Sequence, residues 1–210
     1  MQFGIMADDN TGASDAAGML TANGVRTLLV FSDDLLAPDR VDRERYDAVV
    51  LGTRIRAMSP EAARARTAAA MAALQALGLE HLYIKISSTF DSTPDGNIGP
   101  CLETAMQCLG VDTMLICPAL PVNGRTVYQG HLFVGSRLLS ESSMRDHPLN
   151  PMTDSDIVRW LDRQSTLPVR HIALPRVRQN TDGIEPAVRE AAAAGGGCIV
   201  ADAISDQDLA

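Results

Sequence analysis

The first residues that could take part in binding or catalysis are two adjacent carboxylates, Asp8 and Asp9. They follow a short apolar stretch near the start of the chain. Residues 3–7 are typical of a buried parallel strand, and the polar residues after them, including Thr11 and Gly12, can open a helix with unpaired N–H groups. Ligands bind at the carboxyl edge of open α/β sheets, so this pair is suited to binding Mg²⁺ or sugar hydroxyls. The equally weighted alternative is that one carboxylate only caps the helix.

The second candidate is Lys85, the one lysine among 18 basic residues. Apolar and polar residues alternate around it, which predicts that Lys85 lies on a strand of the sheet. Because lysine is seldom fully buried unless it is paired, we expect it to pair with Asp8 or Asp9. The alternative is a lysine at the sheet edge whose ammonium group reaches water.

A long polar loop follows this strand and carries hydroxyl residues together with Asp91, Asp95 and Asn97. Gly99 and Pro100 then begin the next helix. Because the loop leaves the carboxyl end of a parallel strand, we expect it at the same ligand-binding edge as the carboxylate pair.

A third candidate follows the next strand, in the segment CPALPVNGRTVYQGHLFVG. Asn123 and Gly124 predict a turn, residues 126–128 and 132–134 predict the arms of a hairpin, and Arg125 is left at the turn. A guanidinium group holds a carboxylate through two parallel hydrogen bonds, which a sugar acid offers and a neutral sugar does not. The alternative is a solvent-exposed arginine, the commoner position for this residue type.

The elements that must position these residues alternate between strand-like and helix-like segments, which is typical of an α/β fold with a mainly parallel sheet. The predicted strands are residues 3–7, 25–31, 46–51, 82–86, 112–117, 169–174 and 198–201. The predicted helices end near residues 23, 77, 109, 164 and 194. Ser59 and Pro60 begin the second of them, and Thr153 begins the fourth. We expect one open, mainly parallel sheet flanked by helices, with a β-hairpin inserted after the strand that ends near Cys117.

Composition limits the function classes. A length of 210 residues with 46% hydrophobic content suits a single domain, residues 1–210. The net charge of −8 argues against nucleic acid as a partner, because phosphate binding needs a basic surface. No apolar run is long enough to span a membrane, and the first residues lack a basic signal sequence, so we expect a cytoplasmic protein. The four cysteines lack metal-site spacing and are expected to be buried thiols.

Four ordered segments carry a family resemblance: ADDNTGASD, STFDSTPDGNIGP, CPALPVNGRTVYQGHLFVG and SESSMRDHPLNPMTDSDIVRWL. Together they resemble the amino-terminal half of the four-carbon acid sugar kinase family, most closely its 3-oxo-tetronate branch, in register over residues 3–161. Two positions depart from the wider family pattern. Asp95 replaces an arginine, as this branch allows, and Asn10 replaces a phenylalanine or another apolar residue.

The resemblance implies ATP-dependent phosphorylation of a four-carbon sugar acid at its terminal hydroxyl. In such kinases the amino-terminal half holds the sugar acid and the carboxyl-terminal half binds ATP. The sequence contains no GxxxxGK[ST] or GxGxxG segment. We therefore expect ATP and Mg²⁺ to bind in a carboxyl-terminal half that this chain lacks, and the chain alone to be inactive.

The resemblance and the edge position together assign the site residues. Catalytic roles are expected for Asp8, Asp9 and Lys85, with one of the carboxylates as the base or as a hydroxyl acceptor. Substrate binding is expected for Thr11, Asp15, Ser92, Thr93, Gly96, Asn97, Asn123, Gly124 and Arg125. No residue of the chain is expected to be a metal ligand, and a homo-oligomer stays open as the assembled form.

Two other functions fit parts of the pattern. A non-catalytic sugar-acid-binding or sensor domain would use the same residues without turnover. A receiver-like phosphoacceptor domain also has acidic residues after its first strand and a lysine at the active edge. In that class, however, the lysine follows a later strand and the domain is much shorter, so the kinase half is the preferred interpretation.

Overall fold

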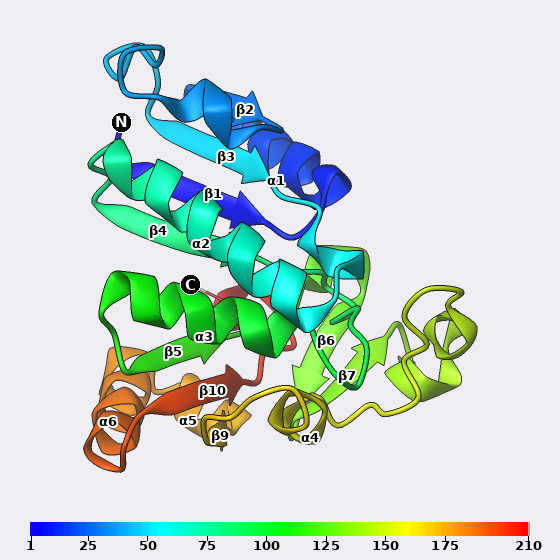
Figure 1. The fold of residues 1–210 in the computed structure, drawn as a ribbon. Coiled ribbons are helices and arrows are strands. Elements are labelled where there is room, and N and C mark those ends of the chain that lie inside the picture. The colour runs from blue at the N-terminus through cyan, green and yellow to red at the C-terminus, as the bar shows by residue number, and fades with distance from the viewer. Residues whose placement is uncertain (210) are drawn as a thin grey trace. The chain divides into compact units, whose positions relative to one another are not determined.

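The computed structural model describes residues 1–209 and divides the chain into two compact units, Met1–Ser87 and the remainder from Ser88 onward. Each unit has its own parallel sheet (Figure 1).

The first unit contains a four-stranded parallel sheet with the order β2-β3-β1-β4. Its strands are β1 (Phe3–Ala7), β2 (Thr27–Val30), β3 (Ala48–Gly52) and β4 (His81–Lys85), and its helices are α1 (Asn10–Ala22) and α2 (Pro60–Ala76). Ala7 pairs with Gly52 on one side and with Lys85 on the other. The carboxyl ends of β1, β3 and β4 therefore lie at one edge, which positions the residues that follow them.

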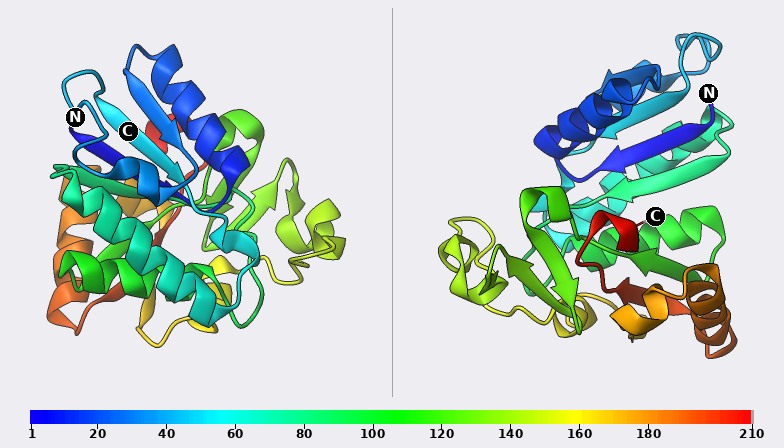
Figure 2. Two further views of the ribbon diagram at one scale, coloured as in Figure 1. Left: turned by 45° about the horizontal axis from the view of Figure 1, so that its top comes forward. Right: turned by 180° about the vertical axis from the view of Figure 1, so that it is seen from behind.

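The two helices of this unit cover opposite faces of the sheet (Figure 2). Helix α1 packs through Ala13 and Ala17 on Ile5 and Val50. Helix α2 begins as the sequence predicts, with Ser59 accepting a hydrogen bond from the N–H of Ala62 and proline at the first helical position. The sheet is thus buried on both faces, as expected of a parallel sheet.

The second unit contains a three-stranded parallel sheet with the order β5-β10-β9. Its strands are β5 (Thr113–Ile116), β9 (Val169–Ile172) and β10 (Gly197–Ala201), and its helices are α3 (Ile98–Leu109), α4 (Ile157–Asp162), α5 (Leu174–Val177) and α6 (Thr181–Ala193). Helix α6 packs on this sheet through Ala187 and Ala191, which contact a core that includes Ile172 and Ile199.

An antiparallel sheet extends the second unit and is formed by β6 (Arg125–Tyr128), β7 (His131–Val134) and β8 (Arg137–Leu138). Short 3₁₀ turns complete the two units, and they are Asp33–Leu36, Ile55–Ala57, Pro121–Asn123, Leu139–Glu141, Ser143–Asp146 and Asp206–Asp208. Strands β6 and β7 confirm the β-hairpin predicted after the strand that ends near Cys117.

One buried carboxylate fixes the hairpin turn to the end of β10. Asp202 accepts hydrogen bonds from the backbone N–H groups of Gln129 (2.8 Å), Gly130 (3.0 Å) and Leu174 (3.0 Å). Its fourth partner is the Nε2 atom of His171, at 2.8 Å. The side chain of Asp202 is fully buried, so this group is a structural anchor with all its acceptor positions in use.

The predicted α/β class with parallel strands flanked by helices is confirmed, whereas the single open sheet is wrong. The parallel strands form two sheets, because β5 takes β10 as its neighbour and β10 takes β9. Sequence order alone does not predict a pairing between strands so distant in the chain. Whether the two units act as one sugar-acid-binding domain stays a prediction.

Candidate functional site

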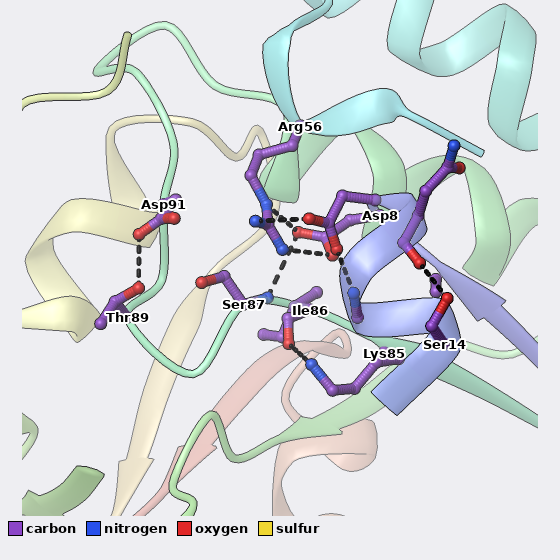
Figure 3. A network of polar contacts seen from close by, with 12 residues as sticks. Asp8, Ser14, Arg56, Lys85, Ile86, Ser87, Thr89 and Asp91 are labelled. Atoms are coloured by element: carbon purple, nitrogen blue, oxygen red, sulfur yellow. Dashed lines mark hydrogen bonds and ion pairs between the residues drawn. The ribbon is translucent and has the colours of Figure 1, made fainter. Parts of the chain in front are cut away.

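Asp8 lies directly after β1 and is almost completely buried, with 5% of its side chain exposed. Its Oδ2 atom accepts hydrogen bonds from Arg56 Nε (3.0 Å) and from the backbone N–H of Ser87 (3.2 Å), and its Oδ1 atom accepts one from Arg56 Nη2 (3.0 Å) (Figure 3). Burial raises the pKa of Asp8, and Arg56 opposes that rise. Asp8 is therefore paired with Arg56, and its catalytic role stays a prediction.

Asp9 is the more accessible member of the pair, with 22% of its side chain exposed. It is the N-cap of α1, and its Oδ1 atom accepts a hydrogen bond from the N–H of Gly12 at 2.7 Å. Its Oδ2 atom lies 2.9 Å from Arg56 Nη1. The helix-cap alternative and the site interpretation are thus compatible, because the cap orients a carboxylate that solvent can still reach.

Arg56 is the central residue of this network, and sequence reasoning did not find it. It lies on the 3₁₀ turn after β3, and its backbone N–H donates to the carbonyl of Asp8 at 3.1 Å. The turn begins at Arg54, which has a positive φ of 60°, an uncommon conformation for a residue other than glycine. One signal was available: Arg56 follows a parallel strand at the same edge as Asp8.

Lys85 ends β4 at the same edge, but it does not form the predicted ion pair. Its Nζ atom donates to the carbonyl of Ile86 at 2.7 Å, and the described residues include no carboxylate in direct contact with it. Its charge still lowers the pKa of Asp8 through space. A Cβ atom on Gly12 would lie 2.7 Å from Asp9 Oδ1 and 3.5 Å from Lys85 Nζ, so a side chain at this position would crowd both groups.

The remaining predicted residues of this edge are less constrained. Thr11 and Asp15 are exposed on α1, and their substrate-binding roles stay predictions. Asn10, the position that departs from the family pattern, has a buried Oδ1 atom without a hydrogen-bond partner among the described residues.

The carboxylate pair does not fit Mg²⁺. Both Asp8 and Asp9 are ion-paired with Arg56, so a cation would have to displace a guanidinium group that already neutralises them. Residues 1–209 contain no cluster of three or more potential metal-binding side chains. We derive no step through a metal bound at this edge.

In the second unit, Ser92 serves the fold. Its hydroxyl donates to the carbonyl of Phe90 at 3.0 Å and accepts from Trp160 Nε1 at 2.9 Å and Gln164 Nε2 at 2.8 Å. A hydroxyl has one donor and two acceptor positions, so all of them are in use. Its predicted contact with substrate is untested, and the structure gives it a positioning role.

The residues after Ser92 form a tight turn that leads into α3. Thr93 accepts from the N–H of Gly96 through both its carbonyl (3.0 Å) and its Oγ1 atom (3.2 Å). Gly96 has a φ of +95°, which favours glycine. Asn97 follows as the N-cap of α3 and is 2% exposed. Thr89 and Asp91 hydrogen-bond to each other at 2.6 Å just before this turn (Figure 3).

Arg125 begins β6, after the predicted turn at Asn123 and Gly124. Gly124 has a φ of +70°, and Arg125 Nη1 donates to the carbonyl of Asn123 at 2.5 Å. The Nε atom of Arg125 is buried and has no hydrogen-bond partner among the described residues. The guanidinium group therefore retains an unused donor, as a carboxylate-binding arginine requires.

A family model described as the sugar-binding N-terminal domain matches residues 3–210. The chain belongs to this family. The match covers every candidate residue described above.

Curated relatives of this sugar-binding domain carry a kinase name. The 3-oxo-tetronate kinase of Brucella melitensis is 44% identical over 212 residues, which cover 100% of this chain and 47% of the relative. That of Pseudomonas fluorescens is 42% identical, over 99% of this chain and 48% of the relative. The chain thus spans about half the length of these relatives, and the predicted resemblance to their amino-terminal half is confirmed.

Solved structures show the same fold. A Salmonella typhimurium LT2 protein matches with a TM-score of 0.92 at 38% identity, over 100% of this chain and 49% of that one. A Haemophilus influenzae protein matches with a TM-score of 0.90 at 37% identity, over 98% and 49%. A Bordetella bronchiseptica protein, described as a domain-swapped dimer with bound citrate, matches with a TM-score of 0.78 at 30% identity, over 100% and 49%.

Proposed function

We propose that the chain is the substrate-binding half of an ATP-dependent kinase that phosphorylates a four-carbon sugar acid, 3-oxo-tetronate or a close relative, at its terminal hydroxyl. The kinase names of the relatives support the reaction class. The observation that carries the proposal is the state of Asp9. It is a partly exposed carboxylate at the carboxyl edge of a parallel sheet, oriented by the Gly12 N–H and by Arg56.

In the first unit, Asp9 would accept the hydrogen bond of the attacking hydroxyl and take up its proton, since phosphoryl transfer requires mainly positioning and a nearby base. Asp8 would act indirectly, by holding Arg56 in place for Asp9. Lys85 would neutralise negative charge at the same edge, because no carboxylate among the described residues contacts its ammonium group.

In the second unit, Arg125 would bind the carboxylate of the sugar acid through its unused Nε donor, with Asn123 and Gly124 shaping the turn. Thr93, Gly96 and Asn97 would contact the oxygen-rich remainder of the ligand. The citrate described for the Bordetella protein is itself a small carboxylic acid, which supports this role for Arg125.

ATP and its Mg²⁺ would bind to the part of the kinase that corresponds to the other half of the relatives. The described part of this chain has no helix able to cross a membrane, and the metabolic role of the relatives supports a cytoplasmic enzyme. The domain-swapped dimer described for the Bordetella protein supports a homo-oligomer.

A non-catalytic sugar-acid-binding domain is the second candidate. It would use the same ligand-binding residues, Asp9 and Arg125 among them, without phosphate transfer. Both functions require ligand binding, and only the first requires phosphate transfer.

The test separates the two by mixing the purified chain with ATP, Mg²⁺ and 3-oxo-tetronate, with and without the carboxyl-terminal half of the Brucella relative. We expect calorimetry to show weak acid binding by the chain alone, and ADP release only when the second half is added. An open half-site cannot hold donor and acceptor in line while excluding water. ADP release by the chain alone would place the nucleotide site within it, and binding without any turnover in the mixture would favour the non-catalytic domain.

A further inference from the structure

Helix α3 begins at an asparagine that makes no cap. Asn97 is the N-cap residue, and its side chain forms no hydrogen bond with the first turn. The residue is 2% exposed, and its Oδ1 atom is buried without a partner among the described residues. A buried acceptor without a partner destabilises a fold, so a native structure that retains one requires an explanation.

Neither of the two backbone N–H groups that normally bond to an N-cap side chain is available to Asn97. An N-cap side chain normally accepts from the N–H of the second or third helical residue. Here the second residue is Gly99, whose N–H donates to Gln164 Oε1 at 3.2 Å, and the third is Pro100, which has no N–H. In contrast, α1, α2 and α4 show the usual bond, in which the side chain of the N-cap residue accepts from a backbone N–H of the first turn. The pairs are Asp9 with Gly12 in α1, Ser59 with Ala62 in α2, and Asp156 with Arg159 in α4.

The groups around Asn97 hydrogen-bond to partners of their own, which keeps the cap from forming. Gln164 Nε2 donates to Ser92 Oγ at 2.8 Å and to the carbonyl of Thr93 at 3.0 Å. These bonds orient the side-chain amide of Gln164, whose Oε1 atom accepts from the N–H of Gly99. A Cβ atom on Gly99 would lie 2.5 Å from the carbonyl oxygen of Gln164, so only glycine permits this close approach. The fold thus keeps the donor of Gly99 away from Asn97.

We propose that Asn97 Oδ1 accepts a hydrogen bond from the C2 or C3 hydroxyl group of the bound acid at the N-terminus of α3. The inference rests on the proposed function and narrows its substrate class. An unpaired acceptor requires a donor, which a hydroxyl group supplies to Oδ1 and a keto or carboxylate oxygen does not. The first turn of α3 contains no acidic residue, and the positive end of the helix favours an oxygen-rich ligand there.

The test measures the affinity of the purified chain, by titration calorimetry, for erythronate and for its 2-deoxy and 3-deoxy analogues, 3,4-dihydroxybutanoate and 2,4-dihydroxybutanoate. We expect Asn97→Ala to weaken erythronate binding about tenfold, equivalent to about 1.4 kcal/mol, and to leave the thermal midpoint unchanged or higher. The loss should disappear for the one analogue that lacks the bound hydroxyl. Asn97→Asp keeps an acceptor and should retain binding.

Ser59→Ala is the matched control, because it removes an N-cap that is formed. It should lower the thermal midpoint and leave erythronate affinity unchanged. Equal affinity in the wild type and folded Asn97→Ala overturns the inference alone, as does an equal loss for all three acids. Failure of the wild-type chain to bind any of them overturns the proposed function and this inference with it.

Discussion

At the scale of single residues, Asp8 and Asp9 differ although they are neighbours of the same type. Asp8 is buried and accepts three hydrogen bonds, from two Arg56 nitrogens and the Ser87 N–H. Asp9 is partly exposed and is held by Gly12 and Arg56. Adjacent positions in a strand-to-helix turn face different environments, so we expect Asp8 to maintain the geometry and Asp9 to take part in the chemistry.

The first prediction separates these roles by substituting each with asparagine. Asp8→Asn replaces an oxygen that accepts from Arg56 or from the Ser87 N–H with an NH₂ group that cannot accept, while Asp9 still pairs with Arg56. We expect it to lose roughly 1–3 kcal/mol of unfolding free energy. Asp9→Asn keeps a cap acceptor and should lose less than about 1 kcal/mol, yet weaken sugar-acid binding at least severalfold. Urea denaturation and calorimetry measure the two effects. Equal stability losses in both variants would contradict the assignment.

The second prediction concerns Arg125. Losing a charge-assisted bidentate contact should weaken binding of erythronate by roughly 1.5–3 kcal/mol in Arg125→Ala. The neutral polyol erythritol lacks the carboxylate, so its weaker affinity should not change. Arg137→Ala, an exposed arginine of the same antiparallel sheet, is the matched control and should bind as the wild type does. If folded Arg125→Ala binds erythronate normally, Arg125 is not in the site.

At the scale of elements, short anchors hold the irregular segments in place. Asp202 joins the turn of the β6–β7 hairpin to β9, β10 and the start of α5 through its four partners. Arg125 begins the first strand of this hairpin. The anchor therefore fixes the element on which the proposed carboxylate-binding residue lies.

The third prediction follows from that anchor. In Asp202→Asn, one oxygen becomes an NH₂ group that cannot accept from backbone N–H groups, so buried donors lose their partners. Each unpaired buried donor costs roughly 1–3 kcal/mol, and we expect the unfolding free energy to fall by roughly 3 kcal/mol. Asp162→Asn, an exposed change on α4, should have almost no effect. A folded Asp202→Asn protein with wild-type stability would show that the anchor is dispensable.

Most elements could be predicted from the sequence, because their signals are local. Ser59 and Pro60 begin α2, and the apolar stretch before Asp8 forms β1, as predicted. The helix predicted for residues 153–164 is shorter, Ile157–Asp162, because Asp156 caps it from inside the predicted range. Local patterns set the type of an element more reliably than its ends.

The candidate site was predicted less completely. Arg56 was missed because its partners are 48 positions away in the sequence, and no local pattern indicates which arginine will face a buried carboxylate. Ser92 was predicted to contact substrate because it lies in a polar loop, yet its hydroxyl is used by Trp160 and Gln164. Lys85 was placed at the correct edge and given the wrong partner. Position follows from topology, whereas pairing depends on tertiary structure.

At the scale of the whole molecule, two units with separate parallel sheets allow local changes to be measured separately. Trp160, the one tryptophan, is buried in the second unit and reports on it by fluorescence. Far-UV circular dichroism reports on the helices and strands of both units.

The fourth prediction compares the two signals, since fluorescence reports on the second unit and circular dichroism on both. Arg56→Met should lower the denaturation midpoint measured by circular dichroism more than the midpoint of Trp160 fluorescence, because Arg56 and its two carboxylates belong to the first unit. Arg26→Met removes an exposed ion pair with Asp47, and it should change neither signal. Equal shifts of both signals in Arg56→Met would show that the chain unfolds as one block.

The same variant has an expected pH dependence. Burial raises the pKa of Asp8 above 3.8, and loss of Arg56 should raise it further. A folded state with a raised carboxyl pKa binds the proton more tightly than the unfolded state, so its stability falls as the pH rises from 3.8 through the folded pKa. Arg56→Met should therefore recover part of its lost stability at about pH 5 relative to pH 7. If the stability lost in Arg56→Met is the same at both pH values, protonation of Asp8 does not contribute to it.

The glycine run before β10 has a consequence for mutational surveys. Gly195, Gly196 and Gly197 all have positive φ, and a Cβ atom on Gly196 or Gly197 would collide with the carbonyl oxygen of Asp112 or Pro168. The run begins β10, at the opposite end of that strand from Asp202. A saturation library selected for growth should deplete every substitution at Gly196 and Gly197 as strongly as at a catalytic position. Depletion at consecutive glycines is also what a glycine-rich nucleotide-binding loop would produce. At Gly196 and Gly197 the steric crowding of the turn is sufficient to explain it.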